Sequence, residues 1–137
     1  MPNVTGVLES SLYVQDLQRS VEFYVNLFAF ERLASDDRFC SFSVAGTQVL
    51  LLFEKGASNQ PMPIPGGVIP PHDGNGSLHV AFSIPAAEWD NWEGKLRSSG
   101  IEVESVVHWP RGGRSLYFRD PDGHLVELVT PGCWAIY

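Results

Sequence analysis

The sequence of this chain repeats one order of secondary structure twice. Each half predicts a strand, a helix, a further strand and a hairpin. Shifting the chain by 70 residues aligns Glu9 with His79 and Val14 with Ile84, so equivalent strands begin both halves. The repeat predicts an α+β fold of paired βαβββ modules. Their strands are expected to form a curved mixed sheet, a half-barrel cup, with the helices on its outer face.

Apolar periodicity predicts the elements of the first half. Residues 4–14 alternate, which indicates a strand with Glu9 and Ser11 on its less apolar face. Asp16 is a typical N-cap, and apolar residues recur at helical spacing after it. The other predicted elements are a helix at 17–28, a short strand at 30–33, and a hairpin of 39–44 and 47–53.

The second half predicts the same order, with a strand at 77–84, a helix from Pro85 to Gly100, a strand at 101–107 and a hairpin at 115–130. A tight turn, Asp120-Pro121-Asp122-Gly123, joins the strands of this hairpin. His124 follows the turn glycine and is expected on its surface. Glu127 lies between aliphatic residues in the last strand, so its carboxylate needs either a solvent-exposed face of the sheet or a paired group or metal.

Proline and glycine separate the two halves. Residues 56–76 hold five prolines among five glycines, which predicts a linker or long loop without helix or strand. Loops of this length are often binding loops, so His72 near its end is a candidate for the edge of a site. The predicted organisation is a first module at 1–55, a loop at 56–75, and a second module with a short C-terminal tail at 76–137.

Composition excludes several classes of function. The net charge of −7 argues against nucleic-acid binding, which requires clustered Lys and Arg. No apolar run is long enough for a membrane helix, and the N-terminus lacks a signal pattern, so a cytoplasmic protein without membrane contact is expected. Cys40 and Cys133 have no metal-finger spacing and are expected to be reduced thiols.

Three polar residues occupy matching positions on the predicted strands. Glu9 and His79 are equivalent under the repeat, and Glu127 lies four residues after a turn glycine. The same count in the first half gives Leu50. One imidazole and two carboxylates suit Zn²⁺, Ni²⁺, Mn²⁺ or Fe²⁺, with positions left for substrate or water. The residues also fit a polar-lined cavity that binds a ligand without metal.

Three stretches resemble the vicinal oxygen chelate superfamily, which includes glyoxalase I, fosfomycin-resistance thiol transferases, extradiol dioxygenases and bleomycin-resistance proteins. They are LYVQDLQRSVEFYVNLFAFE (12–31), LHVAFSI (78–84) and YFRDPDGHLVEL (117–128). The resemblance implies one divalent metal per site, held by Glu9, His79 and Glu127, with Leu50 at the fourth ligand position. It also implies a homodimer in which Glu9 of one subunit meets His79 and Glu127 of its partner.

The resemblance does not fix the reaction. A metal-dependent lyase, isomerase or thiol transferase acting on a small substrate is the first hypothesis, with Glu9 or Glu127 also moving a proton. Fosfomycin is not the expected substrate, because residues 128–137 hold no Arg or Lys for a phosphonate. The alternatives are a metal-free binding protein whose pocket holds Trp109, Trp134 and Phe53, and an Fe²⁺ extradiol dioxygenase.

Three further residues are candidates for substrate binding. Ser11 shares a strand face with Glu9, and Tyr117 lies on the strand before Glu127. Arg114 belongs to a glycine-rich turn and could meet an anionic substrate. Each of these residues is also common as packing or surface in proteins without such a site.

Overall fold

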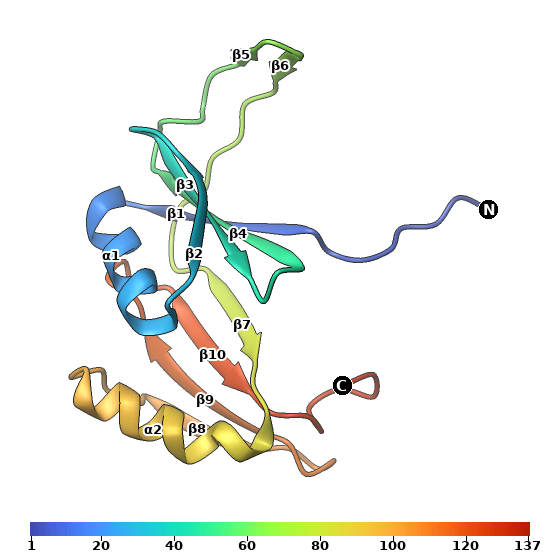
Figure 1. Ribbon diagram of the computed structural model, residues 1–137, viewed down its shortest axis with the longest axis vertical. Helices are drawn as coiled ribbons and strands as arrows, with labels where there is room; N and C mark the ends of the chain where they lie inside the picture. The colour runs from blue at the N-terminus through green and yellow to red at the C-terminus, as the bar shows by residue number, and fades with distance from the viewer. The chain divides into compact units, whose positions relative to one another are not determined.

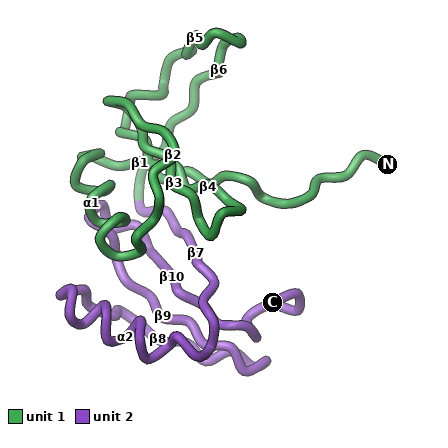
Figure 2. Tube along the Cα trace, viewed as in Figure 1, with its two compact units in different colours: residues 1–76 green, residues 77–137 purple.

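Two four-stranded mixed sheets form the framework of this chain, whose computed structural model describes all residues 1–137. The sheets belong to two units, Met1–Gly76 and Ser77–Tyr137 (Figure 2). Each unit combines its sheet with one α-helix (Figure 1). The α+β fold class with paired βαβββ modules, predicted from the repeat, is confirmed.

The first unit has the sheet order β1-β4-β3-β2, with β1 parallel to β4. Asp16 caps α1 by accepting the N–H of Arg19 at 3.0 Å, as its position predicted. The helix packs against β3 and β4, and the sheet residues buried on this side are Leu12, Val14, Cys40, Phe42, Leu50 and Leu52. The elements are β1 (Glu9–Val14), α1 (Leu17–Phe28), β2 (Glu31–Ser35), β3 (Phe39–Val44), β4 (Gln48–Glu54), β5 (Met62–Ile64) and β6 (Gly67–Ile69).

The second unit repeats this topology in the order β7-β10-β9-β8, with β7 parallel to β10. Its core includes the fully buried Leu116 and Phe118 of β9, Val126 and Leu128 of β10, and Leu96 of the helix. Because side chains alternate on a strand, the odd-numbered residues point to the other face. The elements are β7 (His79–Ser83), a 3₁₀ turn (Ala86–Glu88), α2 (Trp89–Ser98), β8 (Ser105–His108), β9 (Arg114–Arg119) and β10 (Leu125–Val129).

Two local expectations were wrong. The proline-rich segment is not free of strands, since Met62–Ile64 and Gly67–Ile69 pair as a short hairpin. His124 is not on the surface of its turn but fully buried. Its Nδ1 accepts the backbone N–H of Leu78 at 2.9 Å, so the imidazole ties the turn to the start of β7. A buried backbone donor needs a partner, and here a histidine supplies it.

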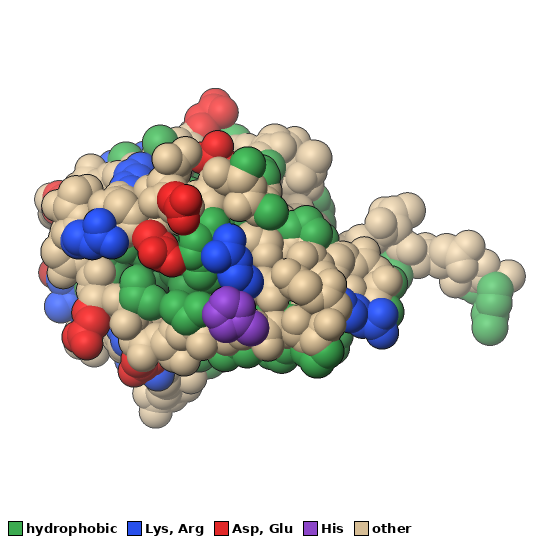
Figure 3. All heavy atoms as spheres, turned by 90° about the horizontal axis from the view of Figure 1, so that it is seen from below, with side chains coloured by type: hydrophobic (Ala, Val, Ile, Leu, Met, Phe, Trp, Pro, Cys, Tyr) green, Lys and Arg blue, Asp and Glu red, His purple; other side chains and the backbone are tan.

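Charges of both signs are interspersed on the face shown in Figure 3, with apolar side chains between them. This face carries no basic stripe of the kind that nucleic acid requires. Neither α-helix is long and apolar enough to cross a bilayer.

Candidate functional site

Two predicted site residues meet on one face of the second sheet. In the parallel register His79 pairs with Leu125, two residues before Glu127, so both side chains point away from the core. His79 Nε2 lies 3.2 Å from Glu127 Oε1. The histidine side chain is 49% exposed and the glutamate side chain only 8%. A nearly buried carboxylate therefore faces an imidazole that solvent and ligands can reach.

The other nitrogen of His79 is fixed by the backbone. Nδ1 lies 2.9 Å from the carbonyl oxygen of Leu125, which can only accept a hydrogen bond. We infer that this contact selects the Nδ1–H tautomer, in which the Nε2 lone pair points at Glu127. Two electron-rich atoms then face the same space. A cation fits there, and metal-binding histidines commonly donate their second N–H to a carbonyl in this way.

A hydrogen-bonded chain holds the second oxygen of Glu127. Ser115, fully buried on β9, lies 2.5 Å from Glu127 Oε2 and donates to it. Its Oγ in turn accepts the indole N–H of Trp109 at 2.8 Å. The serine hydroxyl has one proton, so donation from the indole leaves that proton for the carboxylate. The chain fixes the orientation of the Glu127 carboxylate, so that Oε1 faces His79.

Tyr117 belongs to the same face. It is directly opposite Glu127 in the β9–β10 register, and its ring centroid is 6.4 Å from that of His79. Burial, and then the negative charge of Glu127, raise the pKa of the phenol. Tyr117 therefore remains a hydrogen-bond donor beside the carboxylate across the neutral pH range.

Arg114, by contrast, is not brought to this face. It precedes Ser115 on β9, so strand alternation turns its side chain to the helix side of the sheet. There its guanidinium carbon lies 4.2 Å from the ring centroid of Trp89. The glycine-rich turn suggested a mobile arginine, but the cation–π contact holds it beside α2.

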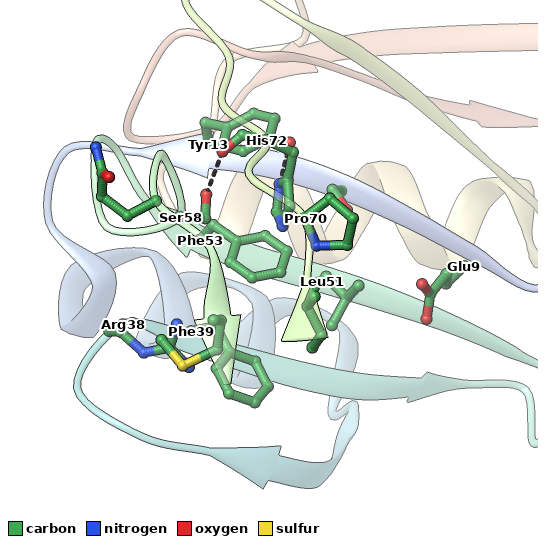
Figure 4. A pocket seen from close by; sticks show the side chains of 13 residues that line it. Glu9, Tyr13, Arg38, Phe39, Leu51, Phe53, Ser58, Pro70 and His72 are labelled. Atoms are coloured by element: carbon green, nitrogen blue, oxygen red, sulfur yellow. Dashed lines mark hydrogen bonds between the residues drawn. The ribbon is translucent and has the colours of Figure 1, made fainter. Parts of the chain in front are cut away.

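Glu9 and Ser11 lie in the first unit and line a pocket of about 480 Å³ on the face opposite α1 (Figure 4). Tyr13 follows them on the same strand face. Within neither unit do three His, Cys, Asp or Glu side chains converge. A site with Glu9, His79 and Glu127 therefore draws on residues of both units, and its assembly stays a prediction.

The residue equivalent to Glu127 in the first half is Leu51, not Leu50. Glu9 pairs with Val49 as His79 pairs with Leu125, so Leu51 matches Glu127 two residues further on. Leu51 lines the pocket, whereas Leu50 is 2% exposed in the core. The correction does not change the residue type, since leucine occupies both positions.

The family model described as the glyoxalase/bleomycin resistance protein/dioxygenase superfamily matches residues 6–128. This chain belongs to that superfamily. It is similar to metallothiol transferase FosB of Bacillus licheniformis, 31% identical over 128 residues that cover 93% of this chain and 76% of that protein. The vicinal oxygen chelate resemblance seen in the sequence is confirmed.

Two solved structures of the superfamily are close in fold. Lactoylglutathione lyase from Agrobacterium tumefaciens has a TM-score of 0.88 at 31% identity, over 98% of this chain and 99% of that chain. The fosfomycin resistance protein FosX from Listeria monocytogenes, in complex with Mn(II) and sulfate, has a TM-score of 0.67 at 28% identity. That match covers 93% of this chain and 91% of the other.

Sequence reasoning missed two residues of these sites. Ser115 was not a candidate, because its hydrogen bond to Glu127 depends on the register between β9 and β10. His72 was only a candidate for the edge of a site, and it lines the pocket of the first unit.

Proposed function

We propose that this chain is a divalent-metal-dependent enzyme, a lyase, isomerase or thiol transferase acting on a small substrate with neighbouring oxygens. The observation that supports this most is the arrangement of His79 and Glu127. A backbone carbonyl fixes the proton of His79 on Nδ1, and Nε2 faces Glu127 Oε1 at 3.2 Å. Membership of a superfamily that includes the Mn(II)-containing FosX also supports a metal.

Glu9 is the proposed third ligand. It lies at the position on β1 that His79 holds on β7, and its side chain is exposed in the chain by itself. We infer a homodimer in which Glu9 of one chain joins His79 and Glu127 of the other. Such sharing suits this protein, because no third His, Cys, Asp or Glu side chain lies beside His79 and Glu127 within their own unit.

The proposed roles follow from which atoms are already occupied. A divalent ion bound there supplies Lewis-acid polarisation of substrate oxygens. Ser115 occupies Glu127 Oε2, so Oε1 is the oxygen that binds the ion or takes up a proton. Tyr117, kept protonated by its raised pKa, donates a hydrogen bond to the substrate. Ser11 lies next to Glu9 on the same strand face and binds a polar group of the substrate.

Metal analysis tests this proposal. Protein purified without chelator should hold about one divalent ion per chain, and His79→Ala and Glu127→Gln should each lose it. His108→Ala is the matched control, because His108 is exposed at the end of β8 and should retain the metal. If the parent binds none of Zn²⁺, Ni²⁺, Mn²⁺ or Fe²⁺, the proposal fails. Bound Fe²⁺ with oxygen uptake on catechols would favour the dioxygenase alternative.

Mixing two inactive variants tests the shared site. Glu9→Ala and Glu127→Gln each disable every site in their own homodimers. If the sites are shared between subunits, a mixed dimer has one site with both original glutamates. Random exchange should then restore metal to about a quarter of the sites. Recovery of no metal after subunit exchange, confirmed by a tagged chain, would place all ligands in one subunit.

A further inference from the structure

The pocket of the first unit has a flat aromatic floor. Phe53 is flanked by Tyr13 at 6.0 Å and Phe39 at 5.8 Å between ring centroids, with interplanar angles of 26° and 27°. The three rings thus form a row across β1, β4 and β3, with Phe53 stacked on both neighbours (Figure 4). Leu51 and Met62 add apolar surface to the floor and wall. A planar apolar group fits such a surface better than a compact polar one, because it can contact several rings at once.

A histidine supplies a directed donor above this floor. The hydroxyl of Tyr13 lies 2.7 Å from Nδ1 of His72. Burial, and then the charge of Asp73, raise the pKa of Tyr13, so its hydroxyl keeps its proton and can donate to Nδ1. We infer that it does so, which selects the tautomer of His72 with its N–H at Nε2. The ring of His72 extends into the pocket beside Phe53, with its centroid 4.6 Å away (Figure 4).

Hydrogen bonds and close packing hold the loop around His72 in one position. Ser58 Oγ donates to the His72 carbonyl at 2.7 Å, and the His72 N–H donates back to the Ser58 carbonyl at 2.9 Å. A Cβ on Gly74 would lie 2.2 Å from the ring of Tyr13, so only glycine allows the chain to pass there. The donor of His72 is therefore preorganised, which lowers the ordering cost of binding a ligand.

The size of the pocket and the charges at its edge limit further which ligands fit it. A pocket of about 480 Å³ is in the range of drug-sized ligands, larger than a three-carbon phosphonate needs. Arg38 lies at the rim, where one terminal nitrogen pairs with Asp36 at 3.0 Å. Glu9 lies at the opposite side of the lining (Figure 4). A ligand with an aromatic ring and an anionic or oxygen-rich edge on the Arg38 side of the pocket matches these groups.

We propose that this pocket receives the aromatic part of the substrate, a planar compound with two neighbouring oxygens, and that His72 Nε2–H binds one of its acceptors. This inference rests on the proposed function, because the metal centre would bind the oxygens while the first unit selects the ring. Phe53 and His72 then determine specificity. Small aliphatic substrates lack the group that the floor contacts.

Binding of 1-hydroxy-2-naphthoate, followed by its fluorescence, tests the proposal with and without chelator. The parent should bind it saturably even without metal, and the saturated 1-hydroxydecahydronaphthalene-2-carboxylate, measured by displacement of the naphthoate, at least about tenfold more weakly. Phe53→Leu should weaken binding about tenfold, and His72→Phe about fivefold, since the latter keeps a ring but loses the donor. Phe30→Leu is the matched control: Phe30 is half-buried, stacks on Phe28 and lies outside the pocket.

The outcomes separate this inference from the proposed function. Metal binding without naphthoate binding would overturn the aromatic substrate class and leave the metal enzyme standing. Naphthoate binding through Phe53 and His72 in a protein that takes no metal would support the pocket and overturn the metal enzyme. If Phe53→Leu and Phe30→Leu bind equally, or the saturated acid binds as tightly as the naphthoate, the pocket is not the aromatic site.

Discussion

Replacing Ser115 with alanine removes one hydroxyl from the centre of the hydrogen-bonded chain in the second unit. That hydroxyl accepts the indole N–H of Trp109 at 2.8 Å and donates to Glu127 at 2.5 Å. Trp109 is half-buried, so water can replace its lost partner. The carboxylate side chain of Glu127 is only 8% exposed and finds a substitute less readily.

Two separate quantities should therefore change. Leaving a buried, charged acceptor without its donor should lower the free energy of unfolding by about 1–3 kcal/mol. Because Ser115 fixes the orientation of Glu127, metal affinity should fall about 10- to 100-fold, which corresponds to roughly 1.4–2.8 kcal/mol. Zn²⁺ titration against a chromophoric chelator measures the second quantity, and urea denaturation measures the first.

Ser98→Ala is the control, because Ser98 is exposed at the end of α2 and its hydroxyl only contacts the Lys95 carbonyl at 3.0 Å. It should change metal affinity by less than about twofold. A Ser115→Ala protein that is less stable but binds Zn²⁺ as tightly as the parent would refute the reasoning. Ser115 would then support the fold without positioning Glu127.

Burial of Asp36 alone would raise its pKa, but hydrogen bonds from the backbone and side chain of Arg38 outweigh it and lower the pKa. The ionised carboxylate consequently stabilises the fold at pH values above the ordinary pKa of an aspartate, about 3.9. This contribution is lost as the pH falls through the lower pKa that Asp36 has in the folded protein. Its side chain is 41% exposed, so solvent screens most of the interaction.

Three further predictions concern stability, each measured by urea denaturation. His124→Ala should lower the free energy of unfolding by about 2–4 kcal/mol, because it empties a fully buried site and orphans a backbone N–H, whereas exposed His108→Ala should cost less than about 0.5 kcal/mol. Gly113→Ala should cost about 1–3 kcal/mol, since its Cβ would lie 2.6 Å from backbone, whereas Gly94→Ala, with open space in α2, should gain about 0.5–1 kcal/mol. Asp36→Asn should cost less than about 1 kcal/mol at pH 7, and the difference from the parent should disappear as the pH falls through the lowered pKa of Asp36.

Local signals were sufficient for most elements of the fold. The helix at 17–28 is observed with those bounds, because its cap, Asp16, and its apolar stripe favour the same structure. The hairpin of β3 and β4 was predictable from Ala45 and Gly46, which both adopt the positive φ that such tight turns require. The faces of β1 were also predictable, since alternation within one strand depends on that strand alone.

The register between paired strands was not predictable from such local signals. The first hairpin closes on Val44 and Gln48, which point to the helix side of the sheet. The second closes on Arg119 and Leu125, which point to the opposite side. A count of four residues from the turn glycine therefore reaches opposite faces of the sheet in the two halves. In the first half it gives Leu50 instead of Leu51. The burial of His124 was not predictable either, because its hydrogen-bond partner is a backbone N–H far away in the sequence.

This difference of one residue leads to a test of the equivalence between the two halves. Leu51 lies on the pocket face and is half-buried, whereas Leu50 is 2% exposed under α1. Leu51→Glu should keep the fold at a cost of about 1 kcal/mol, whereas Leu50→Glu buries an unpaired carboxylate and should cost several kcal/mol or prevent folding. If Glu9 joins the proposed centre, Leu51→Glu adds a carboxylate to the same site and should raise metal affinity above that of the parent. Leu51→Gln, similar in size and uncharged, is the control. Equal stability of the two glutamate variants would contradict the observed register, and tighter metal binding by Leu51→Gln as well as Leu51→Glu would exclude a fourth carboxylate ligand as the cause.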